Sequence, residues 1–216
     1  MDLHEISVSL QNGKIKETLN LIAQAVKENH DVGSILKEGL ADGMAAVEQK
    51  LKDKEIYLPD MLVTAAVMNK GIEILRPALE SIENPVLGTA ITGTLKGDIQ
   101  NINKNLIAAL MRSEGLRVID LGINVSNELF IDTAEKEKAR VIVCSAYLTI
   151  HLPQMKALAQ AAASMKAREN IKLLFTGLPV TEQFCRSIGA DIYAPDVISA
   201  AEMAAAYCKS FKKEPL

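Results

Sequence analysis

Short apolar runs alternate with helical patterns from residue 86 to the end of the chain, and few folds accommodate such an alternation. Strands that are apolar on both faces and separated by helices are typical of a parallel sheet with helices on both sides. Five such strands favour a doubly wound, flavodoxin- or Rossmann-like α/β domain with strand order 2-1-3-4-5. The predicted strands are Val86–Thr92, Val118–Leu121, Val141–Ser145, Leu173–Thr176 and Asp191–Tyr193, and the predicted helices are 103–114, 126–138, 153–168, 180–188 and 197–210.

Residues 1–84 show helical periodicity alone, which indicates a separate helical domain before the α/β domain. Helices predicted at 3–11 and 15–29 are followed by a third near Ser34 and a fourth that begins near Tyr57. Four helices with short connections form a small bundle. We therefore predict a four-helix bundle at 1–84, a linker at Ser81–Pro85 and an α/β domain at 85–216.

The charge balance and the cysteine content argue against several classes of protein. The 216 residues include 24 Lys and Arg against 27 Asp and Glu, a net charge of −3, whereas nucleic-acid binding needs a basic patch. Cys144, Cys185 and Cys208 form no C-x-x-C pair, so neither a disulfide framework nor a zinc site is predicted. No signal peptide is visible at the N-terminus, and no apolar run approaches the roughly 20 residues of a membrane span. We expect a reduced, cytoplasmic protein without nucleic-acid or membrane partners.

A long polar loop, Gly93–Asn105 (GTLKGDIQNINKN), joins the first predicted strand to its helix. A plain strand-to-helix connection needs about 2 to 6 residues, so this loop has more residues and more hydrogen-bonding groups than a connection requires. It either holds a ligand or caps the helix with Asp98 or Asn101. The residues of the loop leave both alternatives open.

The predicted topology brings this loop close to two others. In open α/β sheets, ligands bind beyond the carboxyl ends of the strands, where the winding reverses between strands one and three. The loop after strand three is Ser145–His151, and the loop after strand four is Thr176–Thr181. We therefore expect one site built from three polar loops.

At these loops the sequence resembles a known family. Residues 86 to about 208 resemble the cobalamin-binding domain of corrinoid proteins from methyltransferase systems, such as those that demethylate methylamines, methanol or aryl methyl ethers. The resemblance is carried by the segments GTLKGDIQNINKNLIAALMRSEGLRVIDLGINV, SAYLT, TGLPVT and IGADIYAPDVISAAEMA. The helical segment IYLPDMLVTAAVMNKGIEILRPAL resembles the four-helix cap of the same family.

Three positions depart from the family pattern. The family motif Asp-x-His-x-x-Gly supplies a histidine as the lower ligand of cobalt, whereas this chain keeps Asp98 but has Gln100 and Asn103 at the other two positions. In the family, the benzimidazole base of cobalamin is displaced into a pocket between strands one and three. The Gly-Gly site beside that pocket reads Thr176-Gly177 here, so a β-branched side chain stands where glycine would let the nucleotide tail pass. A glutamine carboxamide is also a weaker cobalt donor than an imidazole oriented by a carboxylate.

These departures leave three alternatives open. Cobalamin binds base-off without a histidine, with Gln100 or water near its lower face. Alternatively, the pocket is degenerate and the fold is a non-catalytic partner-binding or regulatory module. In the third alternative another histidine substitutes; His151 is near the pocket by topology, although a histidine at a helix start is more often solvated. Ser145 and Thr149, at the positions that hydrogen-bond the displaced base in the family, favour the first alternative.

The resemblance implies a corrinoid methyl carrier whose cofactor is cobalamin. Such a carrier passes a methyl group from a substrate-specific methyltransferase to an acceptor methyltransferase, for example one that methylates tetrahydrofolate, and a reductive activator is a further candidate partner. The helical domain would cap the upper face of the cofactor and swing away about the linker. No catalytic residue is expected, because the cofactor carries the chemistry and the protein is a carrier subunit. The implied cofactor-binding residues are Thr94, Lys96, Gly97, Asp98, Ile99, Gln100, Asn103, Ser145, Leu148, Thr149, Thr176, Gly177, Tyr193, Ala194 and Pro195, of which Gln100 is the weak candidate for cobalt.

Overall fold

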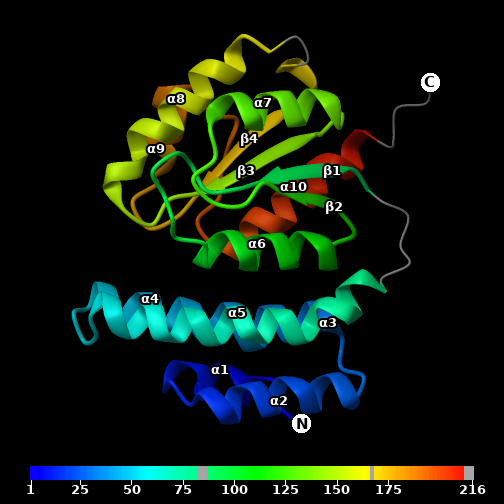
Figure 1. Cartoon of the computed structure of the whole chain (residues 1–216), viewed down its shortest axis with the longest axis vertical. Helices are drawn as coiled ribbons and strands as arrows, with labels where there is room; N and C mark the ends of the chain where they lie inside the picture. Colours follow the sequence, from blue (N-terminus) through cyan, green and yellow to red (C-terminus); the bar gives the residue numbers. More distant parts are fainter. Residues whose placement is uncertain (82–86, 166–167, 212–216) are drawn as a thin grey trace. The chain divides into compact units, whose positions relative to one another are not determined.

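Two compact units, Met1–Glu83 and Asn84–Leu216, make up the chain in the computed structural model of Figure 1. The structure describes residues 1–81, 87–165 and 168–211. The predicted linker therefore lies outside the described residues, except for Ser81.

The first unit is a bundle of helices. α1 packs against α2 and α4, and α5 also packs against α2 and α4, so the four helices enclose one core. Ile6, Leu10, Ile22 and Met68 are fully buried in that core. The third predicted helix is made of α3, a π-helical segment and α4 in succession. The bounds are α1 His4–Gln11, α2 Ile15–Lys27, α3 Val32–Ser34, η1 Ile35–Ala41, α4 Asp42–Lys52 and α5 Leu58–Glu80.

The second unit contains a parallel sheet of five strands in the order β2-β1-β3-β4-β5, which confirms the predicted α/β fold and winding. The strands are β1 Thr89–Thr92, β2 Arg117–Asp120, β3 Val141–Ser145, β4 Lys172–Thr176 and β5 Ile192–Tyr193. The helices are α6 Ile102–Ser113, α7 Asn127–Lys136, α8 Leu152–Ala163, α9 Glu182–Ile188 and α10 Val197–Phe211, with short 3-10 turns η2 Thr149–His151 and η3 Arg168–Asn170.

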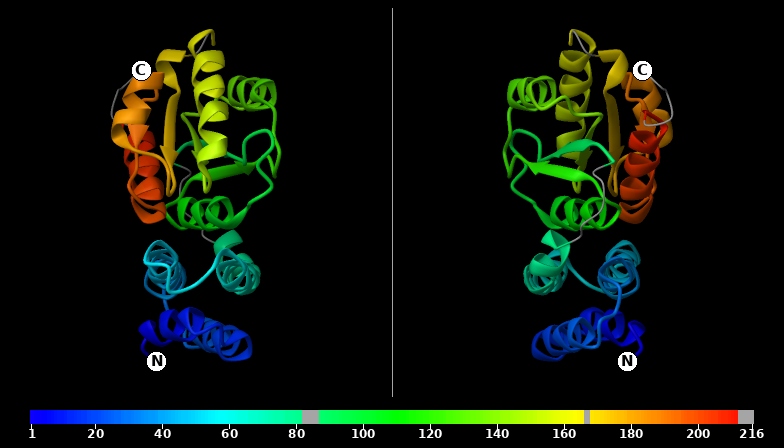
Figure 2. Two further views of the ribbon diagram at one scale, coloured as in Figure 1. Left: turned by 90° about the vertical axis from the view of Figure 1, so that its left-hand side faces the viewer. Right: turned by 90° about the vertical axis from the view of Figure 1, so that its right-hand side faces the viewer.

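Helices cover both faces of this sheet, as Figures 1 and 2 show. α7, α8 and α9 lie on one face, where Cys144 and Phe175 of the sheet join Phe130 and Leu158 in a buried core. α6 and α10 cover the other face. Because successive residues of a strand point to opposite faces, the residues that alternate with Cys144 and Phe175 face α6 and α10.

Some predicted boundaries are wrong by a few residues. The helix predicted from 180 begins at Glu182, because Val180 N–H donates to the Gly177 carbonyl and forms a turn. Thr181 then caps the helix, since its hydroxyl oxygen accepts a hydrogen bond from Phe184 N at 3.1 Å. The helix predicted to reach 168 ends at Ala163, and the first strand begins at Thr89.

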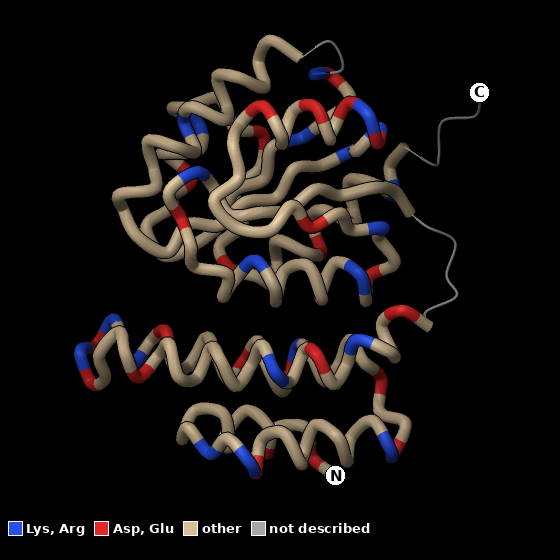
Figure 3. The backbone as a smooth tube through the Cα atoms, viewed as in Figure 1, with Lys and Arg blue, Asp and Glu red and all other residues tan. Residues whose placement is uncertain are grey.

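Charged residues of both signs are interspersed along the backbone, as Figure 3 shows. This arrangement agrees with the near balance of 24 basic and 27 acidic residues. Across the described ranges, no helix has both the length and the apolar character needed to cross a bilayer.

Candidate functional site

The loop after β1 is fixed by hydrogen bonds to the loop after β2. Asn124 N donates to Thr94 Oγ1 at 2.9 Å, and Asn124 Oδ1 accepts from Gly97 N at 2.8 Å. The Thr94 hydroxyl in turn donates to the carbonyl of Asp98. Gly97 has a φ of +83°, which a glycine adopts without the strain that a side chain would add. The loop is therefore an organised turn that presents Asp98 at a defined position.

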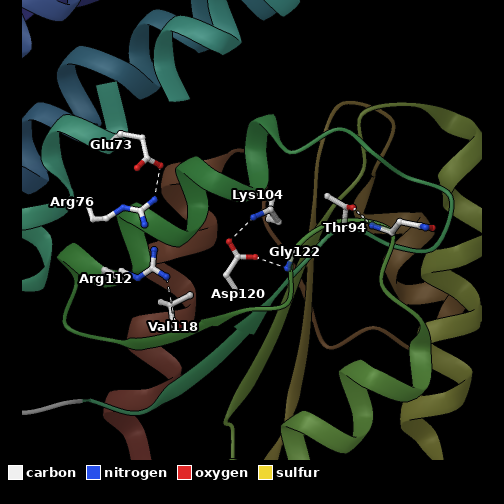
Figure 4. Close-up of polar contacts among 9 residues, drawn as sticks. Glu73, Arg76, Thr94, Lys104, Arg112, Val118, Asp120 and Gly122 are labelled. Carbon is white, nitrogen blue, oxygen red and sulfur yellow. Dashed lines mark hydrogen bonds and ion pairs between the residues drawn. The ribbon is translucent and has the colours of Figure 1, made fainter. Parts of the chain in front are cut away.

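An ion pair between a buried lysine and an exposed aspartate supports the other side of the same sheet edge. Lys104 Nζ of α6 lies 2.5 Å from Asp120 Oδ2 at the end of β2, and Lys104 is only 4% exposed. Asp120 Oδ1 also accepts from Gly122 N at 2.9 Å, as Figure 4 shows. The pair ties the first helix of the unit to the start of the β2 loop.

The most unusual contact of the site joins the loops after β1 and β3. His151 Nδ1 lies 3.2 Å from Asp98 Oδ2, and both residues are buried. Asp98 Oδ1 accepts from Gln100 N at 2.9 Å. His151 Nδ1 makes no hydrogen bond with any described group, so the two side chains are close without an aligned hydrogen bond. A carboxylate and an imidazole thus lie together beneath the surface at the winding reversal.

The sequence predicted the position of His151 but not its burial. Topology placed it near the loop after the first strand, and its contact with Asp98 confirms that the two loops come together. The prediction of a solvated ring is wrong, because His151 is only 6% exposed. The 3-10 turn Thr149–His151, closed by His151 N donating to the Leu148 carbonyl at 3.1 Å, turns the ring inward, and its neighbour Ile150 is exposed instead.

Three apolar side chains are exposed around this buried pair. Ile99 follows Asp98 and is 69% exposed, while Ile150 precedes His151 and is 71% exposed. Leu148 on the same loop is 38% exposed. Because Asp98 and His151 are in contact, their neighbours Ile99 and Ile150 belong to one region of the surface. Exposed apolar groups that gather at a sheet edge mark a binding surface more often than isolated ones do.

Hydroxyl groups lie at the ends of β3 and β4. Ser145 pairs with Thr176 in the parallel register, and both residues are buried. Thr176 Oγ1 has no hydrogen-bond partner among the described residues. Gly177, the next residue, has a φ of +121°, and a Cβ there would lie 1.9 Å from the carbonyl oxygen of Ala146. The glycine is therefore required by the close approach of the β3 and β4 loops.

The other predicted site residues lie in different environments. Asn103 is buried on α6, whereas Lys96 is exposed and Gln100 is half-buried. Thr149 is exposed, unlike Ser145, so the structure does not bury the two predicted base-binding hydroxyls together. Tyr193 ends the edge strand β5, and Ala194 and Pro195 follow it. The next residue, Asp196, accepts a hydrogen bond from Ser199 N at 2.7 Å as a cap of α10.

The structure also locates the predicted helix caps and the residues of the site that were not predicted from the sequence. Asn101 occupies the N-cap position of α6 without a side-chain cap, and Asp98 bonds to Gln100 N instead. Asn124 was not predicted as part of the site, although Gly122 and its own positive φ of 56° mark a tight turn there. The Lys104–Asp120 pair was also missed, because its two residues lie 16 positions apart and nothing local links them.

Two models of known families match the chain. The model described as "B12 binding domain" matches residues 88–202, which is the α/β unit, and a second model with the same description matches residues 3–76. A monomethylamine corrinoid protein of Methanosarcina acetivorans is 32% identical over 208 residues, which cover 93% of this chain and 96% of that protein.

The chain belongs to the family of corrinoid proteins of methyltransferase systems.

Other relatives agree with this assignment. A trimethylamine corrinoid protein of Methanosarcina mazei is 32% identical over 182 residues, covering 82% of this chain and 84% of its own. The solved structure of the Methanosarcina barkeri monomethylamine corrinoid protein has a TM-score of 0.78 at 30% identity and covers 93% of this chain and 95% of its own. The cofactor inferred from the resemblance, cobalamin, is thus confirmed at the level of the family.

The residues of this corrinoid protein suit that cofactor in part. The exposed apolar group Ile99, Leu148 and Ile150 suits a flat macrocycle, and the unpartnered Thr176 hydroxyl suits a polar ligand. Gln100 is half-buried two residues after Asp98, and its side chain offers a carboxamide rather than an imidazole.

The buried Asp98 makes the stability of the α/β unit depend on pH. Burial raises the pKa of its carboxyl above the usual value of 3.8, while the Gln100 N–H and the His151 charge act in the opposite direction. Since the folded chain holds this proton more tightly than the unfolded chain, stability from Asp98 is lost as pH rises through the raised pKa. We expect Asp98→Asn to gain unfolding free energy relative to the wild type as pH rises above the usual carboxyl pKa of 3.8.

Urea unfolding of the ligand-free protein at several pH values measures this difference. Asp132 is exposed on α7, so Asp132→Asn provides a control. Its difference from the wild type in unfolding free energy should change much less with pH. A difference for Asp98→Asn that stays constant over the whole range would contradict the prediction.

Proposed function

We propose that this protein is a corrinoid methyl carrier that binds cobalamin base-off at the carboxyl edge of the sheet, between β1 and β3. It receives a methyl group from a substrate-specific methyltransferase and hands it to an acceptor methyltransferase such as one acting on tetrahydrofolate. The cobalt atom of a bound corrinoid would carry the methyl group. We assign residues 1–84 the role of cap domain and residues 85–216 the role of cobalamin-binding domain.

The observation that carries this proposal is the apolar surface around the buried Asp98–His151 pair. Ile99 and Ile150 are about two-thirds exposed, although large aliphatic side chains usually gain by burial. They lie at the sheet edge where ligands of this fold bind. A macrocycle seated there would remove both side chains from water, and the ordered loop would fix its orientation.

The chain's own residues would set the environment of the lower face. Asp98 is held by Gln100 N and lies against His151, so it does not depend on a ligating histidine for its position. Gln100 would offer a carboxamide rather than an imidazole. Removal of a strong donor should disfavour the oxidised states of cobalt and ease its reduction, a property that suits a carrier served by a reductive activator.

The partners proposed for this protein are inferred from the names of its relatives. The relatives are named as monomethylamine and trimethylamine corrinoid proteins, and one solved structure of the same fold is a methanol:cobalamin methyltransferase complex of Methanosarcina barkeri. These names support methyltransferases as the partners of this chain.

Loading with cofactor tests the proposal directly. Full-length apo-protein is mixed with hydroxocobalamin, desalted, and examined by visible spectroscopy. We expect the wild type to retain corrinoid, and Ile150→Glu to retain at least about 10-fold less, because a charge then faces the macrocycle. Val8→Glu, a change at a 43% exposed position of α1, should bind like the wild type.

A colourless wild-type protein would overturn the proposal. Gln100, Asn103 and Thr176 would then be marks of a degenerate pocket, and the chain would act as a non-catalytic partner-binding or regulatory module. Equal retention by the wild type and Ile150→Glu would show that the cofactor does not bind at the proposed surface.

A further inference from the structure

Thr176 carries a polar group that the folded chain leaves unused. It ends β4 and is 1% exposed, and its Oγ1 has no hydrogen-bond partner among the described residues. A buried hydroxyl that gives up water without gaining a partner destabilises the folded state. A ligand that supplies the missing hydrogen-bond partner would remove this loss of stability.

The register of the sheet defines where this hydroxyl points. Ser145 of β3 and Thr176 of β4 are direct partners, so their side chains lie side by side on the same face. The preceding residues, Cys144 and Phe175, belong to the core under α7 and α8. Ser145 and Thr176 therefore face the opposite layer, formed by α6 and α10.

α10 presents small side chains to that layer. It contacts β3 and β4, and Ala200, Ala201 and Ala204 on it are fully buried. α10 begins four residues after β5 ends, so its first turns lie toward the carboxyl edge of the sheet, where Ser145 and Thr176 also lie. The two hydroxyls thus face the layer that contains these alanine side chains, at the edge that we assign to the corrinoid.

We propose that Thr176 reads the nucleotide tail of the corrinoid: its hydroxyl donates a hydrogen bond to the displaced base or its linker, next to Ser145. This inference rests on the proposed function. The family pattern has glycine at this position, so the contact belongs to this chain and selects corrinoids that carry a tail over those that lack one.

The test compares two corrinoids that share the macrocycle. Cobalamin carries the nucleotide tail and cobinamide does not, and both are titrated into the full-length apo-protein. Thr176→Val keeps the shape of the side chain and removes the hydroxyl. We expect it to weaken cobalamin binding by about 3- to 10-fold and to leave cobinamide binding unchanged.

Two further variants separate a hydrogen bond from a steric effect. Thr176→Ser keeps the hydroxyl and should keep the wild-type preference for cobalamin. Thr133→Val makes the same chemical change on α7, which covers the other face, and should alter neither affinity. As a readout without ligand, Thr176→Val should unfold at higher urea than the wild type, because the unpartnered hydroxyl is gone.

The outcomes are distinct. Unchanged or tighter cobalamin binding by Thr176→Val would overturn the inference and show that the side chain obstructs the tail. Equal weakening for cobalamin and cobinamide would also overturn it, since the effect would then not concern the tail. If the wild type binds neither corrinoid, the proposed function fails and this inference fails with it.

Discussion

Gly177→Ala should destabilise the α/β unit by about 3 kcal/mol or more, a large share of the stability of a domain. A Cβ at this position would lie 1.9 Å from the carbonyl oxygen of Ala146, and that neighbour is backbone, which cannot move aside like a flexible side chain. The φ of +121° adds strain for any residue with a side chain. Because the clash separates the loops after β3 and β4, corrinoid retention should fall together with stability.

Gly122→Ala is the matched control for this effect. Gly122 also has a positive φ, +87°, but a Cβ there meets nothing within 4 Å. Its cost should be limited to the backbone term of about 1 to 2 kcal/mol. Urea unfolding followed by far-ultraviolet circular dichroism measures both variants, with separate transitions fitted if the two units unfold independently. Similar losses for Gly177→Ala and Gly122→Ala would show that the contact with Ala146 is not what requires the glycine.

The sequence predicted the parts of this fold that depend on periodicity and winding. Apolar runs separated by helices identified the parallel strands, and the order 2-1-3-4-5 then placed the loops after β1 and β3 at one edge. The proximity of the loops that carry Asp98 and His151 follows from that topology. Long periodic segments report their type well, because each residue repeats the same constraint.

Features that depend on one backbone turn or on tertiary packing were not predictable in the same way. The inward direction of His151 and the exposure of Thr149 result from one 3-10 turn before α8. The pairing of Lys104 with Asp120 requires α6 and β2 to be packed first. The role of Gly177 is also tertiary, since its neighbour Ala146 lies on another loop. In the last two cases the deciding partner is distant in the chain, so no local pattern records it.

Loaded with cobalamin and reduced to the Co(II) state, the wild-type protein should show no nitrogen splitting from a lower ligand in its electron paramagnetic resonance spectrum. Gln100 offers oxygen, and the His151 ring is buried with its Nδ1 against Asp98. Gln100→His should introduce the splitting, because an imidazole is a strong cobalt donor and Asp98 is already in place beside it to orient the ring. The change should be from absent to clearly resolved.

Two further variants decide what a different spectrum would mean. Asn103, buried on α6, replaces the glycine of the family motif, so Gln100→His with Asn103→Gly provides more room for the new ring. If that double variant remains unsplit, the loop does not place residue 100 beneath the cobalt. A split wild-type spectrum would contradict the prediction, and its loss in His151→Gln would assign the lower ligand to His151. The Asp98–His151 pair would then replace the lost histidine by a residue from a different loop, with the same carboxylate serving the new imidazole.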